Sequence, residues 1–126
     1  MGRVWWLAGG ISGFLAVAAG AFGAHGLEER VAPDLLAVFE TGARYHLVHA
    51  LALCAVASLA SRAPAGAVRV AGWSFLAGTV LFSGSLYALV LTGIRSLGAV
   101  TPFGGVALLA GWAALAVAGW RSRPGE

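Results

Sequence analysis

Residues 70–91 are VAGWSFLAGTVLFSGSLYALVL, a run without one charged side chain. A helix needs about 20 such residues to cross the ~30 Å hydrocarbon core of a membrane. Three further apolar stretches of similar length occur in the chain, at residues 4–24, 43–60 and 102–120. We therefore predict an all-α integral membrane protein with four transmembrane helices.

The overall composition supports one small membrane domain. Hydrophobic residues make up 60% of the 126-residue chain and charged residues only 10%, which is far from the average of soluble proteins. Strands of a membrane barrel would alternate apolar and polar residues, whereas these runs are continuous. The first run is also longer than the apolar core of a signal peptide, which spans about 7–15 residues. We predict that residues 1–126 form a single four-helix bundle.

Arginine predicts the orientation, because the chain has no lysine and cytoplasmic loops retain an excess of basic residues. Tryptophans, which favour the membrane interface, lie at span ends on the basic side: Trp5, Trp6, Trp73 and Trp120. Both termini are therefore predicted to be cytoplasmic. The net charge of +3 reflects topology and contact with anionic lipids, and no basic run indicates a nucleic-acid partner. With four spans, the side of the termini carries Arg3, Arg62, Arg69, Arg121 and Arg123, and the other side carries Arg30, Arg44 and Arg95.

The longest connection, residues 26–42, lies on the outer side in this topology. Pro33 suits the first turn of a helix, where its missing N–H costs nothing. We expect a short interfacial helix that starts near Pro33 and bends near Gly42 into the second span. Glu40 and Arg44 are four residues apart, so they can form an ion pair on one helix face.

Small residues at four-residue spacing predict close helix packing, which replaces the hydrophobic drive that lipid removes. Cys54 is the only cysteine, so neither a disulfide nor a multi-cysteine metal site can form within the chain. The small residues are Gly9, Gly13, Ala16, Gly20 and Ala24 in the first span, and Gly104 or Gly105 in the fourth.

Polar side chains within the spans concentrate in the outer half of the predicted bundle. Tyr45 and His49 are four residues apart, as are Ser83 and Tyr87, so each pair shares a helix face. A shared interior cluster is therefore possible. Its candidate members are His25, Tyr45, His49, Ser83, Ser85, Tyr87 and Thr101.

The ends of the spans give further expectations for this cluster. His25 lies at the depth of Tyr45 if the first two spans are antiparallel neighbours, so we expect His25 to face the cluster and not lipid. Gly26 is placed to cap the first span in a left-handed conformation. Thr101 is placed to N-cap the fourth span, with Pro102 in the first turn.

Two functions are compatible with such a cluster. It can be a hydrogen-bond network that fixes helix register, since interhelical polar contacts are worth about 0.6–2 kcal/mol each in membranes. We favour this explanation, in a non-enzymatic accessory or scaffold protein. The alternative is an outward-facing pocket of a small-solute or proton transporter or channel component. The expected partners are membrane lipids and either another membrane protein or further copies of the chain.

No metal, cofactor or enzyme class is indicated. His46 and His49 are three residues apart without a nearby carboxylate or thiolate, which does not match common metal motifs. Haem between His25 and His49 is conceivable, but two helix-end histidines are its only support. No Ser-His-Asp order, phosphate loop or paired carboxylates indicate catalysis. His46 lies on a different helix face from Tyr45, so we expect His46 at the interface, outside the cluster.

Four motifs carry a family resemblance: GAFGAHGL at residues 20–27, TGARYHLVHALAL at 41–53, LFSGSLYALVLTG at 81–93 and TPFGG at 101–105. Together they resemble the bacterial membrane family called domain of unknown function 423, which is similar to eukaryotic transmembrane protein 256. The resemblance implies a four-helix protein of the bacterial inner membrane without an established biochemical activity. The family pattern, which does not include His46, points to His25, Gly42, Tyr45, His49, Ser83, Gly84, Ser85, Tyr87, Thr101, Pro102 and Gly105.

Overall fold

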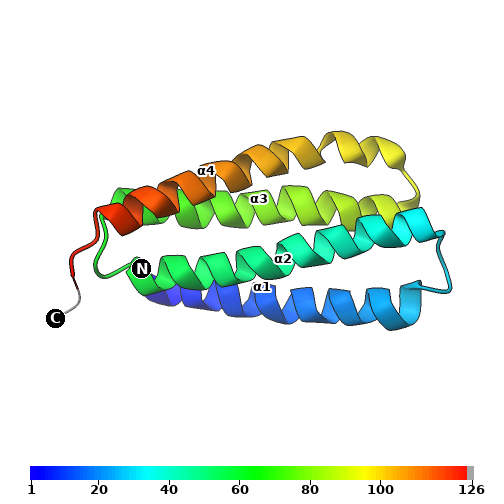
Figure 1. Ribbon diagram of the computed structural model, residues 1–126, viewed down its shortest axis with the longest axis horizontal. Coiled ribbons are helices and arrows are strands. Elements are labelled where there is room, and N and C mark those ends of the chain that lie inside the picture. Colours follow the sequence, from blue (N-terminus) through cyan, green and yellow to red (C-terminus); the bar gives the residue numbers. More distant parts are fainter. Residues whose placement is uncertain (125–126) are drawn as a thin grey trace.

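The four apolar stretches form four long antiparallel helices in the computed structural model, which describes residues 1–124 (Figure 1). A π-helical turn, η1 (Gly23–Leu27), extends the first helix, and a 3-10 helix, η2 (Arg95–Ala99), precedes the last one. Each span is long enough and apolar enough to cross a membrane. The predicted all-α fold with four transmembrane helices is therefore confirmed. The helices are α1 (Gly2–Phe22), α2 (Pro33–Leu59), α3 (Ala65–Thr92) and α4 (Thr101–Trp120).

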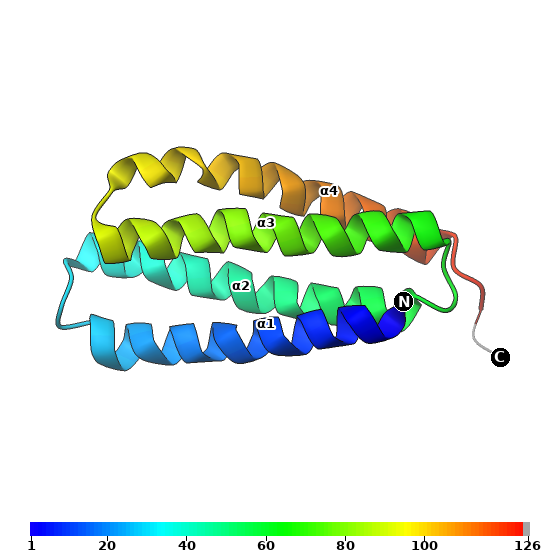
Figure 2. The same ribbon diagram turned by 180° about the vertical axis from the view of Figure 1, so that it is seen from behind.

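The helices lie side by side in chain order, with α2 and α3 in the middle (Figures 1 and 2). Within residues 1–124, α1 and α4 share no extensive contact. In an apolar 18-residue window of each span, 44% and 39% of the residues are buried in α2 and α3, against 22% in the spans that contain α1 and α4. The two outer helices therefore present long apolar faces, as helices in contact with lipid do.

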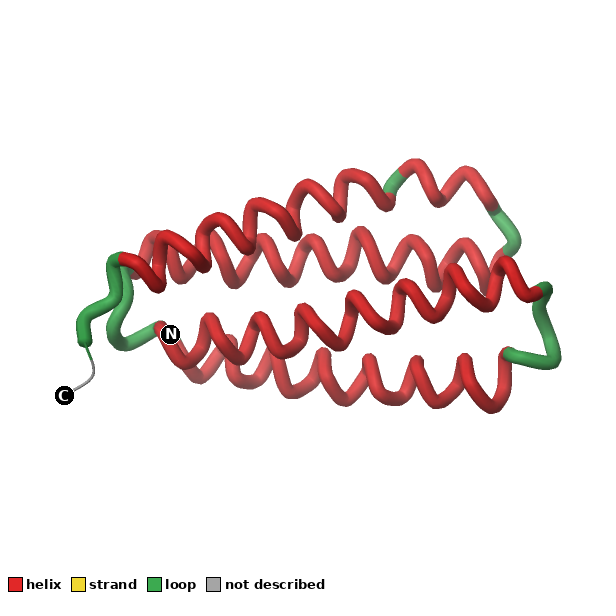
Figure 3. The backbone as a smooth tube through the Cα atoms, in the orientation of Figure 1, coloured by secondary structure: helices red, strands yellow, loops and turns green. Residues whose placement is uncertain are grey.

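The two ends of the bundle differ in what they carry. The N-terminus, residues 121–124 and the turn at residues 60–64 lie at one end, which we call the terminal end (Figure 3). The connections at residues 28–32 and 93–100 lie at the opposite end, the distal end. The backbone N–H of Arg123 donates to the carbonyl of Arg62 at 2.8 Å and holds the tail against the α2–α3 turn.

Glycines allow close approach at particular helix crossings. A Cβ added at Gly104 would lie 2.4 Å from the backbone nitrogen of Phe82, so α3 and α4 approach closely at this point. A Cβ at Gly9 would lie 3.1 Å from the carbonyl oxygen of Ala50 on α2. Gly20 has nothing within 4 Å of its added Cβ. The prediction of small-residue packing is therefore right at Gly9 and Gly104 and wrong at Gly20.

The outer segment that begins at Pro33 is helical as predicted, but it continues into the span as one helix, α2, without a break at Gly42. Its residue Phe39 is buried with Leu27 and with Leu89 and Val90 of α3. This apolar contact holds the segment against the bundle, which is why it does not lie flat at the interface.

Two smaller expectations at the distal end are also corrected. Gly26 lies inside η1, and the positive φ within residues 1–124 occurs at Gly93 (φ 75°), which ends α3. The ion pair expected between Glu40 and Arg44 is not formed within residues 1–124. The ion pair in this part of the chain joins Asp34 to Arg95 at 3.5 Å, and both side chains are well exposed. Exposed pairs of this kind contribute little to stability.

Candidate functional site

Four hydrogen bonds between helices connect the polar residues of the distal half of the bundle. Each bond joins groups from two different helices. In lipid such bonds contribute about 0.6–2 kcal/mol each, so together they fix the relative positions of α2, α3 and α4. They join His46 to Tyr87, His49 to Trp112, Ser83 to the carbonyl of Gly42, and Ser85 to Thr101.

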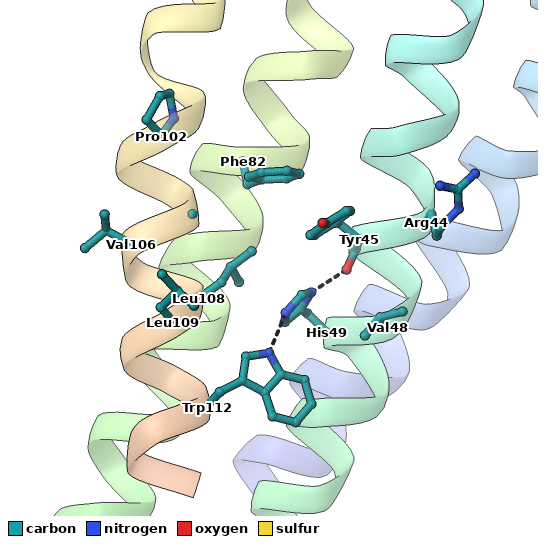
Figure 4. A pocket seen from close by; sticks show the side chains of 11 residues that line it. Arg44, Tyr45, Val48, His49, Phe82, Pro102, Val106, Leu108, Leu109 and Trp112 are labelled. Atoms are coloured by element: carbon teal, nitrogen blue, oxygen red, sulfur yellow. Dashed lines mark hydrogen bonds between the residues drawn. The ribbon is translucent and has the colours of Figure 1, made fainter. Parts of the chain in front are cut away.

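His49 bridges α2 to α4 and is only 4% exposed. Its Nδ1 lies 2.7 Å from the carbonyl oxygen of Tyr45, and its Nε2 lies 3.0 Å from Nε1 of Trp112 (Figure 4). The carbonyl can only accept and the indole N–H can only donate, so Nδ1 carries the proton and Nε2 accepts. Both nitrogens of a neutral imidazole are therefore occupied within the protein.

His46 bridges α2 to α3, because its Nδ1 lies 3.0 Å from the hydroxyl of Tyr87. His46 is 9% exposed, so the expectation that it lies at the interface outside the cluster is wrong. Gly42, one turn earlier, allows this approach, since a Cβ there would lie 3.0 Å from the Tyr87 ring. Ser83 then donates to the Gly42 carbonyl at 2.7 Å.

Ser85 and Thr101 join α3 to α4 through their hydroxyl oxygens, which are 2.6 Å apart. Thr101 was expected to N-cap α4, but α4 begins at Thr101 itself, and the N-cap residue is Val100 without a side-chain bond. The Thr101 hydroxyl is therefore used between helices. Pro102 lies in the first turn of α4, as predicted.

Tyr45 and His25 lie outside this set of side-chain bonds. The Tyr45 ring packs on Phe82 with a centroid distance of 4.5 Å, and its hydroxyl makes no hydrogen bond within residues 1–124. His25 is exposed, and in the same described part of the chain it makes no hydrogen bond.

The buried residues of η1 explain the position of His25. They are Gly23 and Leu27, and a Cβ at Gly23 would lie 3.0 Å from the Phe39 ring. His25 is two positions from each, about half a helical turn away, and so it points outward. This corrects the expectation that His25 faces the bundle interior.

Apart from Ser85 and Thr101, the polar side chains of the site divide between two grooves on different sides of α2 and α3. The first, which we call the α4 groove, lies between α2, α3 and α4 and has a volume of about 710 Å³. Its polar lining residues are Arg44, Tyr45, His49 and Trp112, and its walls are otherwise apolar (Figure 4). The second, the α1 groove, lies between α1, α2 and α3 and has a volume of about 480 Å³. Its polar lining residues are Ser12, His46, Thr79, Ser83 and Tyr87.

This division decides what the site can do chemically. The single cluster expected from the sequence consists of separate pairs, and His46 and His49 face different grooves. No three His, Cys, Asp or Glu side chains within residues 1–124 come together as a metal-binding group. The arrangement offers a ligand apolar walls with a few hydrogen-bond donors at their edges.

Comparisons with known proteins place the chain in a family. Residues 19–105 match the family model described as "Protein of unknown function (DUF423)". The chain belongs to this family. It is 50% identical to the UPF0382 membrane protein YwdK of Bacillus subtilis (strain 168) over 117 residues. The aligned region covers 92% of this chain and 95% of that protein.

Two staphylococcal relatives agree with this assignment. UPF0382 membrane proteins of Staphylococcus epidermidis (strain ATCC 12228) and Staphylococcus aureus (strain bovine RF122) are 41% and 43% identical, over 92% and 87% of this chain and 94% and 89% of their own lengths. No solved structure matches the chain. The family resemblance inferred from the motifs is confirmed, and the relatives are named only as membrane proteins.

Sequence reasoning missed Trp112 and misplaced His46. In the spans predicted from the sequence, Trp112 is the one tryptophan that lies well inside, whereas the other four lie near span ends. A tryptophan surrounded by apolar residues usually finds an acceptor for its indole N–H. The position of Trp112 in the sequence was therefore a usable signal for a polar partner on another helix.

Proposed function

We propose that this DUF423 protein is a non-enzymatic accessory subunit or scaffold of the membrane, and that its distal polar residues hold the helices in register. His49 carries this proposal, because both of its ring nitrogens are bonded within the protein and join α2 to α4. Such a histidine has no nitrogen left to act as an acid or base on a substrate. The Ser83 hydroxyl donates to the Gly42 carbonyl on α2, and the Ser85 hydroxyl bonds to Thr101 and to the Phe82 carbonyl of its own helix, so both hydroxyls already have partners within the protein.

The outer helices supply the surfaces that an accessory protein needs. Phe14 on α1 is 76% exposed and Phe103 on α4 is 72% exposed. Both lie on long apolar faces, which can pack against lipid, against another membrane protein or against a second copy of the chain.

Native purification tests the accessory role. Extracted in mild detergent at its natural abundance, the protein should carry a stoichiometric protein partner or form a discrete homo-oligomer. Phe103→Ala should weaken that association several-fold. His49→Gln should instead lower the stability of the folded chain before it affects the association. A protein that purifies as a monomer under every mild condition would contradict the proposal.

A transport function is the second candidate, and the α1 groove favours it. The Thr79 hydroxyl is buried and makes no hydrogen bond within residues 1–124. Thr79, Ser83 and Tyr87 follow each other at four-residue spacing along α3, so they form a polar stripe on the wall of this groove.

Liposomes separate the two candidate functions. We expect the purified chain to add no proton flux above protein-free liposomes, measured with an enclosed pH-sensitive dye under an imposed membrane potential. A flux that Thr79→Val removes without changing the helical content would establish the transport function instead.

We also propose that the protein lies in the bacterial inner membrane with both termini in the cytoplasm. The support is the unequal division of the arginines between the two ends of the bundle. A phosphatase reporter that works only outside the cytoplasm should be inactive when fused after Glu126 and active when fused after Ser96 in the distal connection. The reverse pattern would invert the topology.

A further inference from the structure

The α4 groove has the length and the walls of a site for a lipid chain. It follows α4 from Pro102 to Trp112, ten residues that rise about 15 Å. This is half of the ~30 Å hydrocarbon core, so the groove runs from the distal surface to the middle of the membrane. Val106 and Leu109 at its edge are 65% and 71% exposed, and both contribute apolar side chains.

In the inner part of the groove, the lining side chains are either apolar or already hydrogen-bonded within the protein. Trp112 and His49 bond to each other there, so neither polar group needs a ligand (Figure 4). Leu108 and Leu109 provide the neighbouring wall. A polar headgroup would therefore gain nothing at this depth, whereas an acyl chain would keep the contacts it has in the bilayer.

The distal part of the groove carries two hydrogen-bond donors that have no partner. Arg44 is exposed and forms no ion pair within residues 1–124, not even with Glu40 one turn away. Tyr45 is 41% exposed, and its hydroxyl is likewise without a bond in the described chain. Arginine can extend its charged group to the interface while its stem covers apolar surface.

We propose that the α4 groove binds an anionic glycerophospholipid. Its phosphate accepts hydrogen bonds from the hydroxyl of Tyr45 and from the guanidinium of Arg44. Figure 4 shows the Arg44 side chain on the opposite side of α2, and this exposed side chain turns towards the groove when the lipid binds. Arginine pairs well with phosphate oxygens in both charge and geometry. One acyl chain lies along the groove towards Trp112. The volume of about 710 Å³ lies within the range of roughly 300–1,000 Å³ that ligand sites occupy. The lipid site does not depend on the accessory role proposed above.

Native mass spectrometry of the full chain tests this site. The protein is released from mixed micelles that contain equal amounts of phosphatidylglycerol and phosphatidylcholine with identical acyl chains. One phosphatidylglycerol should remain bound, with about a fivefold preference over phosphatidylcholine, which is the effect expected of one arginine near a membrane surface.

Three variants locate the bound lipid. Arg44→Gln should reduce the preference to about one, because it keeps the groove and removes the charge. Arg30→Gln, which removes a distal arginine outside the groove, should leave the preference unchanged. Gly105→Leu should fill the groove and reduce retention of both lipids, since its Cβ would meet Phe82 only at 4.0 Å and the fold can accept it. Circular dichroism of each variant verifies the helical content.

Several outcomes would overturn the proposal. Equal retention of the two lipids by the unaltered protein, or a preference that survives Arg44→Gln, would remove the phosphate contact. Displacement of the lipid by inorganic phosphate, together with no effect of Gly105→Leu, would reduce the site to a phosphate contact without a chain. A dimer that Gly105→Leu dissociates would show that a second copy occupies the groove.

Discussion

Gly104→Leu should destabilise the bundle by about 3 kcal/mol, the upper end of the usual cost of overpacking. An added Cβ at Gly104 would lie 2.4 Å from the backbone nitrogen of Phe82 and 2.8 Å from its Cα. Backbone atoms of a helix cannot rotate away as a side chain can, so α3 and α4 would have to separate. That separation would also stretch the bond between Ser85 and Thr101.

Gly105→Leu is the matched control, because it adds the same side chain one position further along the same helix. Its Cβ would have only the Phe82 ring within reach, at 4.0 Å. We expect a loss below about 1 kcal/mol, within the range of tolerated changes. Unfolding in increasing dodecyl sulfate, followed by circular dichroism, measures both variants. Equal losses would show that α3 and α4 do not approach most closely at Gly104.

The four spans, and the connections that lie at each end of the bundle, could be predicted from the sequence because lipid imposes simple requirements. Backbone groups in a membrane must be bonded within the helix, and about 20 residues are needed to cross. These rules act on continuous stretches such as residues 70–91, and they do not depend on how the helices are rotated. The same is true of Pro33, whose preference for a first helical turn is local.

Side-chain pairing depends on helix rotation, which spacing alone does not give. The four-residue spacing correctly put Tyr45 and His49 on one face of α2, and Ser83 and Tyr87 on one face of α3. It could not show that these faces line different grooves. The same limit applied to His46. This residue is one position after Tyr45, so it lies on a different face of α2, and that face is turned to Tyr87 on α3.

Two further details could not be predicted from the spacing of residues: which of two glycines contacts α3, and the direction of His25. Gly104 and Gly105 are adjacent and chemically identical, so only the rotation of α4 decides which one contacts α3. His25 turned outward because α1 ends in η1 and the burial of Gly23 and Leu27 sets the direction of the intervening residues. A π-helical turn has no clear sequence signature in the stretch from Gly23 to Leu27.

Trp5→Ala should produce the second large loss, at the opposite end of the protein. Trp5 is 3% exposed, and its ring occupies the space that a side chain at Gly72 would need, since an added Cβ would lie 2.4 Å from the indole. It also packs edge-on against Trp73 at a centroid distance of 5.5 Å. Truncation leaves a cavity between α1 and α3, at a cost of roughly 2–3 kcal/mol, because lipid removes the hydrophobic part of the usual penalty and leaves the lost packing.

Trp5→Phe separates packing from hydrogen bonding at this site. The indole nitrogen of Trp5 is buried and makes no hydrogen bond within residues 1–124, so its removal breaks no bond. Phenylalanine retains most of the ring contact, and we expect a loss of no more than about 1 kcal/mol. Trp6→Ala is the control at the neighbouring position, where the side chain is 53% exposed. If Trp6→Ala lowers the midpoint of unfolding in dodecyl sulfate as much as Trp5→Ala does, the insertion of Trp5 over Gly72 does not anchor α1, and the attachment of α1 must come from its contact with α2 alone.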